Sequence, residues 1–209
     1  MNTNLFLQRQ KMKKLSTYLF LIFFSFSAPS FADDISELQI EGISIGDSLL
    51  DHLSKEEIIT EIEVNKPTYN YLTDDFGEVY LEGNFQIYDL LSFFVKPDDK
   101  NYTIYDIRGG IYYDDKIEQC YAKQKEIVEE FSLSYKNTRK VEETFKFPWD
   151  PTGKSNVRNI FLYFDSGDVI TVSCAEYEKS LKIKNNWADA LSVEILKKEV
   201  ENWMKNHIN

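Results

Sequence analysis

Two β-rich segments joined by four polar residues constrain the fold of this 209-residue chain more than any other feature. Val157 to Phe164 and Val169 to Cys174 are rich in β-branched and aromatic residues, and Asp165-Ser166-Gly167-Asp168 separates them. Glycine accepts the positive φ that tight hairpin turns require. The stretch therefore predicts two antiparallel strands.

The middle of the chain repeats this pattern. Ile87 to Lys96 and Tyr102 to Tyr113 are predicted strands on either side of a turn from Pro97 to Asn101. The pair Gly109-Gly110 predicts a bulge or bend in the second strand. Strands joined by tight turns are antiparallel neighbours, so we expect an antiparallel sheet rather than an alternating βαβ series.

A long helix is expected between the two hairpins, from Lys116 to about Tyr135. Its apolar residues recur with the 3.6-residue period of one helix face, and Glu and Lys occupy the other side. These apolar positions are Ile117, Cys120, Tyr121, Val128, Phe131 and Tyr135. The apolar face predicts packing of this helix against the sheet.

Shorter helices are expected near both ends. Asp47 is predicted to cap a short helix from Ser48 to Leu53. The capping box Ser54-Lys55-Glu56-Glu57 then predicts a second helix to about Ile62. A C-terminal helix is predicted over Lys197 to His207. The segments 64–76 and 177–186 are predicted to be irregular, and Leu191 to Ile195 a last strand.

Together these elements predict the α+β class. The expected architecture is an antiparallel sheet built from hairpins, packed by a long central helix, with short N-terminal and C-terminal helices. We expect a single domain over residues 33–209. It can also be described as two packed α-β-β-β units, about 44–113 and 116–174, followed by the C-terminal helix.

The first 32 residues have the pattern of a secretory signal peptide. Four basic residues, Arg9, Lys11, Lys13 and Lys14, precede an apolar run from Leu15 to Ala28. Small residues at Ser30 and Ala32 then predict cleavage after Ala32. The alternative is an uncleaved anchor, but the run is shorter than the roughly 20 residues of a membrane span. The expected location is the periplasm or the secreted fraction, and translation can start at Met1 or Met12.

The composition is acidic, with 24 Lys and Arg against 35 Asp and Glu and a net charge of −11. Removing the four basic residues of the leader leaves 20 against 35, a net charge of −15. Such a surface repels phosphate backbones and anionic membranes. We expect no nucleic acid partner, no transmembrane segment in the mature chain, and a monomer that binds another protein or an envelope component.

Cys120 and Cys174 are the only cysteines, and both follow the leader. An oxidising compartment and an even number of cysteines favour one disulfide. Cys120 falls on the apolar face of the long helix, and Cys174 alternates onto the same strand face as Ile170 and Val172. Both thiols are therefore expected between helix and sheet. The alternative is a pair of reduced core cysteines.

The stretch Gly46-Asp47-Ser48-Leu49 resembles the nucleophile motif of the SGNH/GDSL hydrolase family over about six residues. The resemblance implies a serine esterase that uses Ser48. The chain departs from that family elsewhere, because the family places its base in an Asp-x-x-His block near the C-terminus. Here the late histidine is His207, and Met204 stands three residues before it. An esterase is therefore the alternative function and not the first one.

The residues offer no set of metal ligands, since two histidines and two paired cysteines form no ligand pattern. We expect no metal and no cofactor. Aromatic residues in predicted loops instead suggest a contact surface, because amphipathic aromatics are common at interfaces. The candidates are Tyr69, Tyr71 and Trp149.

The leader followed by Gln39-Ile40-Glu41-Gly42-Ile43-Ser44-Ile45-Gly46-Asp47-Ser48 resembles short exported bacterial proteins of unassigned function. The step from Ile43 into a short helix is also similar to the helix-plus-sheet units of β-lactamase-inhibitor-like and outer-membrane-assembly small proteins. This resemblance implies a binding module rather than a catalyst. A solute-binding protein with a pocket between helix and sheet is a further alternative.

Overall fold

The computed structural model describes residues 35–69, 73–114, 116–148 and 150–207, with the side chains of 67–69 left out. Seven antiparallel strands form the main sheet, in the order β3-β4-β5-β9-β8-β7-β6. A two-stranded sheet precedes it. The strands are β1 (Gln39–Ile40), β2 (Ile43–Ser44), β3 (Gly77–Leu81), β4 (Leu90–Val95), β5 (Ile104–Asp114), β6 (Arg139–Lys146), β7 (Asn156–Tyr163), β8 (Val169–Glu176) and β9 (Asp189–Leu196).

Helices are distributed along the chain between these strands. They are the 3₁₀ turns η1 (Ile35–Glu37) and η2 (Leu49–Asp51) and the helices α2 (Lys55–Tyr69), α3 (Ile117–Ser134), α4 (Lys179–Asn185) and α5 (Lys198–His207). The predicted α+β class is confirmed, as are the two hairpins, the long central helix and the C-terminal helix.

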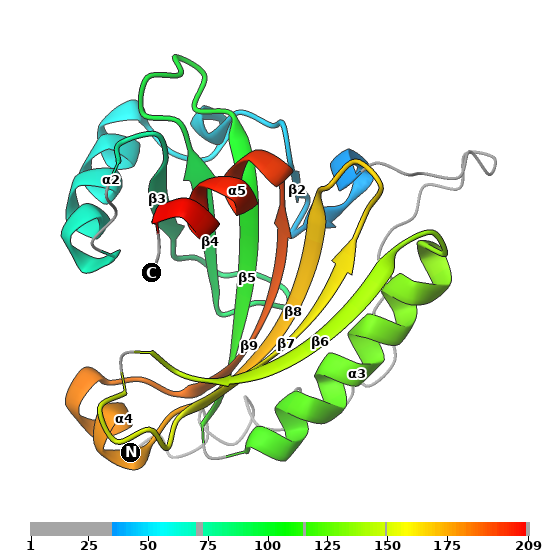
Figure 1. Cartoon of the computed structure of the whole chain (residues 1–209). Helices are drawn as coiled ribbons and strands as arrows, with labels where there is room; N and C mark the ends of the chain where they lie inside the picture. The colour runs from blue at the N-terminus through cyan, green and yellow to red at the C-terminus, as the bar shows by residue number, and fades with distance from the viewer. Residues whose placement is uncertain (1–34, 70–72, 115, 149, 208–209) are drawn as a thin grey trace, which may run out of the picture. The chain divides into compact units, whose positions relative to one another are not determined.

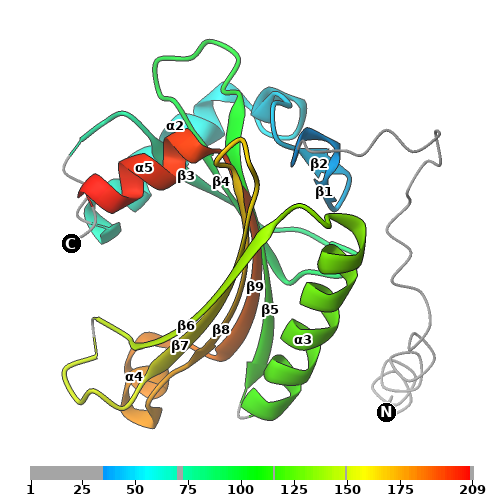
Figure 2. The ribbon, with the colours of Figure 1, turned by 45° about the vertical axis from the view of Figure 1, so that its right-hand side comes forward.

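The main sheet is curved, and helices lie on both of its sides (Figure 1). The long helix α3 packs against β8, β9 and β5 on one side. Figure 2 shows α5 and α4 on the opposite, concave side, at its two ends, with the sheet between them. We call the side under α3 the covered face and the concave side the open face.

Alternation along the strands gives the two faces different chemistry. On the covered face one row of cross-strand neighbours is entirely apolar and fully buried: Phe93, Ile107, Ile195, Ile170 and Leu162. The next row on the open face, one residue along each strand, is Ser92, Arg108, Glu194, Thr171 and Phe161. The covered face therefore buries most of the apolar surface of the sheet. Each Å² of apolar surface removed from water stabilises the fold by roughly 25 cal/mol.

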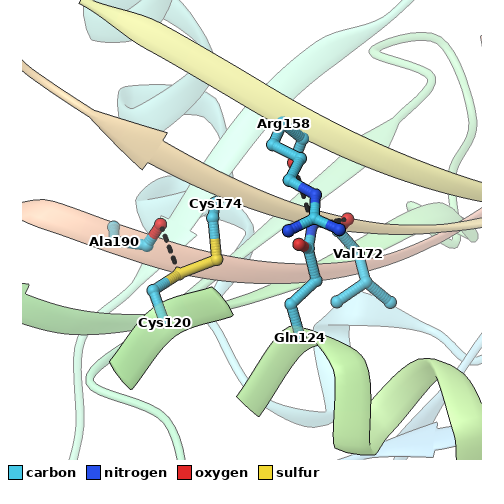
Figure 3. Close-up of a disulfide and its surroundings, with 6 residues drawn as sticks. All are labelled: Cys120, Gln124, Arg158, Val172, Cys174 and Ala190. Atoms are coloured by element: carbon cyan, nitrogen blue, oxygen red, sulfur yellow. Dashed lines mark hydrogen bonds between the residues drawn. A yellow bond between two sulfur atoms is a disulfide. The ribbon is translucent and has the colours of Figure 1, made fainter. Parts of the chain in front are cut away.

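The predicted disulfide between Cys120 and Cys174 joins α3 to β8, with Cα atoms 6.0 Å apart (Figure 3). One turn along α3, the buried amide of Gln124 donates to the carbonyl oxygens of Arg158, at 2.9 Å, and Val172, at 2.8 Å. These two oxygens belong to β7 and β8, so Gln124 links the helix to both strands. Gln124 is thus a buried polar residue on the helix face that packs against the sheet. The apolar periodicity of the sequence did not predict it.

Four local predictions are wrong. The sheet register shifts at Phe94/Val95 and Tyr112/Asp114, and not at Gly109-Gly110. A Cβ on Gly109 would lie 2.4 Å from Tyr88 Cδ1, so close packing of the Tyr88 ring explains this glycine. The helix α2 continues to Tyr69, and α4 occupies most of the predicted loop 177–186.

The fourth error concerns the cap of the first short helix. Ser48, not Asp47, is the N-cap of η2. The Asp47 carboxylate instead accepts from the Ser44 amide at 2.8 Å, which closes the turn before the helix. The Ser54–Glu57 capping box is confirmed, with Ser54 N–H donating to Glu57 at 2.8 Å and Glu57 N–H to Ser54 Oγ at 3.3 Å. The predicted leader, residues 1–32, lies outside the described residues.

Candidate functional site

The candidate site is the stretch of the open face between α5 and α4 (Figure 2). Its centre is a group of four ionisable side chains from three strands, which we call the carboxyl cluster: Glu78 of β3, Asp106 and Arg108 of β5, and Glu194 of β9. These strands lie close together although 116 residues separate Glu78 from Glu194. Cross-strand pairing of Arg108 with Glu194 sets the centre of the cluster.

Arg108 is held by two carboxylates. Its Nε and Nη2 both donate to Glu194 Oε1, the first at 3.0 Å. Its Nη1 lies 3.8 Å from Glu78 Oε1. The Arg108 side chain is 33% exposed, whereas the side chains of Glu194 and Glu78 are 13% and 1% exposed. The Arg108 side chain is thus held by two carboxylates and remains partly exposed on the open face.

Asp106 is fully buried, and neither of its side-chain oxygens receives a hydrogen bond in the described structure. Burial raises the pKa of Asp106 well above its ordinary value, and the neighbouring negative charge of Glu194 adds to the effect. In its protonated form Asp106 can donate to Glu194 and no longer needs donors of its own. The cluster is then a neutral acid beside an Arg108–Glu194 ion pair.

The pKa values of Glu78 and Arg108 are also shifted by burial and by the charges of the cluster. Burial raises the pKa of Glu78, and the charge of Arg108 opposes this rise. Burial opposes the charged form of Arg108, but Glu194, Asp106 and Glu78 together hold the pKa of its guanidinium well above the usual range. Arg108 therefore stays a cation at every pH at which the chain is folded.

An aromatic group borders the open face at its α4 end. Phe147, Tyr177 and Trp187 contact one another, with ring centroids 5.0 to 5.7 Å apart. Burial raises the pKa of the Tyr177 hydroxyl, and the positive charge of Arg108 opposes this rise. The aromatic group and the carboxyl cluster therefore interact electrostatically. Tyr112 on β5 and Phe145 on β6 are 51% and 40% exposed and face the same side of the sheet.

At the opposite end of the open face, α5 covers the sheet and packs its aromatic side chain Trp203 against it. Trp203 lies against the rings of Phe76 and Phe94, with centroids 5.4 and 5.8 Å apart. The Trp203 indole N–H donates to Thr73 Oγ1 at 2.7 Å. This end is a small buried core, so the accessible part of the open face begins at the row that contains Arg108.

The alternative nucleophile Ser48 lies away from this site. Its hydroxyl donates to the carbonyl oxygen of Asn101 at 2.7 Å, and its backbone bridges to Thr103. Within the described residues neither histidine forms a hydrogen bond with Ser48, and His207 Nδ1 lies 2.9 Å from Trp203 O. The Ser48 hydroxyl thus anchors the turn before η2 to the segment that leads into β5.

Of the other predicted site residues, two form a disulfide away from the candidate site and three have no described side chain. Cys120 and Cys174 form the disulfide under α3 and belong to the covered face. Tyr71 and Trp149 lie outside the described residues, and Tyr69 ends α2 without a described side chain. The predicted contact surface at these three residues stays a prediction.

Sequence reasoning missed all four members of the carboxyl cluster. A signal was present in the return strand, where Asp106 and Arg108 are two residues apart and therefore share a face. Glu194 is likewise a single charge inside the apolar run Leu191 to Leu196. Charges inside strands are rarely buried unless they are paired, so these positions point to a polar site on one sheet face.

No group of three or more His, Cys, Asp and Glu among the described residues has a geometry that holds a metal ion. In the same part of the chain, no helix is long and apolar enough to cross a membrane. Comparisons with protein-family models, with curated proteins and with solved structures found no match.

Proposed function

We propose that the mature chain is an exported, non-catalytic binding protein, and that its open face binds a protein partner with a positively charged docking surface. One observation supports this most: Arg108, held by two carboxylates and 33% exposed, shares with the exposed Tyr112 and Phe145 a sheet face that no described helix covers between α4 and α5. Export is supported by the sequence of the leader and by the disulfide.

The composition of the open face is that of a protein interface. Tyr, Trp and Arg are the residues most enriched at the centres of such interfaces. Here Arg108 and Tyr112 lie on β5, Phe161 on β7 and Phe145 on β6, and Trp187 follows α4. Seven strands about 4.8 Å apart give a width of roughly 29 Å, which suits a standard interface of about 800 Å² per partner.

The arginine is already held in place before any partner arrives. Its ion pair with Glu194 and its contact with Glu78 fix the guanidinium, so binding loses little side-chain entropy at this position. Arg108 also retains exposed surface that can stack on a partner's aromatic ring or donate to a backbone carbonyl.

The charge of the domain favours a basic partner. A net charge of −11 for the whole chain, and more without the leader, attracts a positively charged surface and speeds its encounter. Carboxylates also line a cleft beside α5, where Asp74, Asp75, Asp98 and Glu199 share the lining with Lys96. High salt is therefore expected to slow association.

Quantitative affinity capture from the envelope fraction of the producing cell tests the proposal. The bait is the mature chain, and the comparison is the double variant Tyr112→Ala/Phe145→Ala. The matched control is Leu133→Ala, because Leu133 is 75% exposed on α3, on the other side of the sheet. We expect one protein whose recovery falls at least tenfold with the double variant and in high salt, and is unchanged with the control.

Equal recovery of every captured protein by the double variant and the wild-type chain would contradict the proposal. Capture of a lipid or glycan instead of a protein would also contradict it, because the proposed occupant is a protein. Thermal unfolding of each bait is the control for folding.

A further inference from the structure

We infer that the edge strand β6 pairs with β6 of a second copy of this chain, antiparallel and centred on Val141, so that two sheets join into one. This inference does not depend on the partner proposed for the open face. It rests on an unprotected sheet edge and on the order of charges along that edge.

The two edges of the main sheet differ. At the β3 edge, side chains of α2 bind the outward backbone groups: Glu61 accepts from the Tyr80 amide at 3.3 Å, and Asn65 donates to the Glu78 carbonyl at 3.2 Å. Within the described residues, no side chain forms a hydrogen bond with the backbone of β6 (139–146), and no strand pairs with its outer side. Every residue of β6 except Val141 is exposed.

An edge of eight residues is a template for pairing with another strand. Proteins usually prevent this with charges on the edge, and β6 carries several. Charges prevent pairing only when they meet like charges. The order Arg139-Lys140-Val141-Glu142-Glu143 places two cations before Val141 and two anions after it.

This order is self-complementary in an antiparallel pair. When Val141 faces Val141 of the second copy, Lys140 faces Glu142 and Arg139 faces Glu143, and symmetry produces each contact twice. Opposite charges directly across two strands stabilise the pair. The sequence of the edge therefore provides four favourable cross-strand contacts about one two-fold axis.

Neighbouring registers that keep each face continuous are unfavourable. A pair centred on Glu142 or Glu143 brings that carboxylate against its own copy, and a pair centred on Lys140 does the same with two ammonium groups. Like charges directly opposite each other are destabilising. The charges thus select the register centred on Val141.

Contacts within one copy leave the necessary groups available. Arg139 lies over the Tyr163 ring, with its guanidinium carbon 4.4 Å from the centroid, and Glu142 accepts from Arg158 at 2.7 Å. Lys140 and Glu143 form no ion pair with any described residue. The second copy supplies the missing partners of Lys140 and Glu143 and gives Glu142 a second cation.

The geometry also brings the two open faces to the same side. Val141, Glu143 and Phe145 face the side of Phe161 and Val157, and a residue that pairs with its own copy keeps its face. The paired ladder covers five residues, far less than a standard interface of about 1,600 Å². We therefore expect a weak dimer, seen at concentrations on the order of 100 μM.

Sedimentation equilibrium of the mature chain over a concentration series tests the dimer. We expect the average mass to rise from monomer toward dimer, and to rise less in 0.5 M NaCl because the four ion pairs are exposed. A monomer mass at every concentration up to 1 mM in low salt would overturn the inference.

Two charge variants test the self-complementary order. Arg139→Glu/Lys140→Glu makes the edge acidic, and Glu142→Lys/Glu143→Lys makes it basic. Each alone should be monomeric, and an equimolar mixture should form a heterodimer at least tenfold tighter than the wild-type homodimer. The matched control, Lys55→Glu/Lys100→Glu, alters two exposed lysines away from β6 and should dimerise like the wild type. A monomeric mixture of two folded variants would refute the charge pairing.

A cysteine scan tests the register even if the charge variants do not fold. Directly opposed residues have Cα atoms about 4.5–5.5 Å apart, within the disulfide range. Val141→Cys should give a covalent dimer on mild oxidation at high protein concentration. Glu143→Cys should not, because the two copies of residue 143 lie about 13 Å apart along the strands. Equal crosslinking of both variants, or of neither, would contradict the register.

Discussion

The two faces of one sheet have opposite roles in this protein. Adjacent residues of β4, β5, β9, β8 and β7 face opposite sides of the sheet. The row of cross-strand neighbours on the covered face is Phe93, Ile107, Ile195, Ile170 and Leu162. The next row, on the open face, is Ser92, Arg108, Glu194, Thr171 and Phe161. The first row lies in the main hydrophobic core, to which α3 also contributes. The second carries an ion pair with accessible surface.

A small domain can hold charges in its strands without losing stability when the other face of the sheet supplies the burial. The covered face supplies the apolar burial, the disulfide and the Gln124 bridge to two strands. Because these contacts fix the strands, Asp106 can remain buried on the other face at a cost that the covered face offsets.

Loss of the disulfide should have the largest effect on stability. Cys120 and Cys174 close a loop of 54 residues in sequence separation. In the loop-entropy model such a crosslink is worth about 4 kcal/mol. Cys120→Ala/Cys174→Ala should lower Tm by roughly 8–16 °C in a domain of this size. Calorimetry of the variant, with the reduced wild-type chain as a second sample, measures it; a Tm within 2 °C of the oxidised protein would contradict the prediction.

The adjacent glycines Gly109 and Gly110 face opposite sides of the sheet, so substitutions at the two positions probe one face each. A Cβ on Gly109 would lie 2.4 Å from Tyr88 Cδ1, whereas a Cβ on Gly110 meets nothing closer than Leu90 O at 3.9 Å. Gly109→Ala should therefore cost about 1–3 kcal/mol, the usual range for overpacking. Gly110→Ala is the matched control and should stay within about 0.5 kcal/mol of the wild type.

Urea unfolding of both variants measures this contrast. Equal stability of Gly109→Ala and Gly110→Ala would mean that the Tyr88 ring moves aside freely. Packing on the covered side of β5 would then be looser than the structure indicates.

Asp106 should make stability fall as pH rises. Its folded-state pKa lies above the ordinary value of about 3.9, so the folded chain keeps a proton that the unfolded chain has lost. Stability is therefore lost as pH rises from about 4 toward the folded-state pKa. Asp106→Asn cannot ionise and keeps a donor for Glu194, so we expect its Tm to exceed that of the wild type by about 2–4 °C at pH 8, or ~1 kcal/mol.

Toward about pH 4 and below the difference should vanish, because Asp106 is then protonated in the unfolded chain as well as in the folded one. Asp98→Asn is the control, since Asp98 is exposed in the turn after β4. Thermal unfolding monitored by circular dichroism at pH 4 and at pH 8 measures this difference. A variant that is less stable than the wild type by the same amount at both values would show that Asp106 is ionised in the folded chain.

The smallest expected effect on stability is at the exposed aromatics. Tyr112→Ala removes a side chain that is 51% exposed and forms no ring contact within the described residues, so its free energy of unfolding should change by less than about 0.5 kcal/mol. Chemical denaturation measures it, with Phe93→Ala on the covered face as the contrasting variant at about 3–5 kcal/mol. A large loss in Tyr112→Ala would assign that residue to the core rather than to a binding surface.

Local patterns predicted most of the fold. The 3.6-residue period of α3 and the turn at Gly167 are readable because each is set by neighbours in sequence. The end of α2 and the whole of α4 were missed because only Ile58, Ile62 and Asn65 are buried among the residues of α2 with described side chains, and only Leu181 in α4. Helices with so few buried positions show no apolar face.

The candidate site was not predicted because its order in space is long-range. The last strand, β9, inserts between β5 and β8 and thereby brings Glu194 beside Arg108. No local pattern fixes that insertion, since the two hairpins are formed without it. The disulfide was predictable because both cysteines fall on apolar faces that local periodicity reveals.

Site-specific photocrosslinking in the producing cell tests most directly whether the open face is the binding face. A photoreactive residue replaces Tyr112 or Phe145 on the open face, or Leu133 on the outer side of α3, all of them exposed. We predict one crosslinked protein adduct from Tyr112 and from Phe145, at an intensity at least tenfold above that from Leu133. Adducts of equal intensity from all three positions, or an adduct from Leu133 alone, would contradict partner binding at the open face.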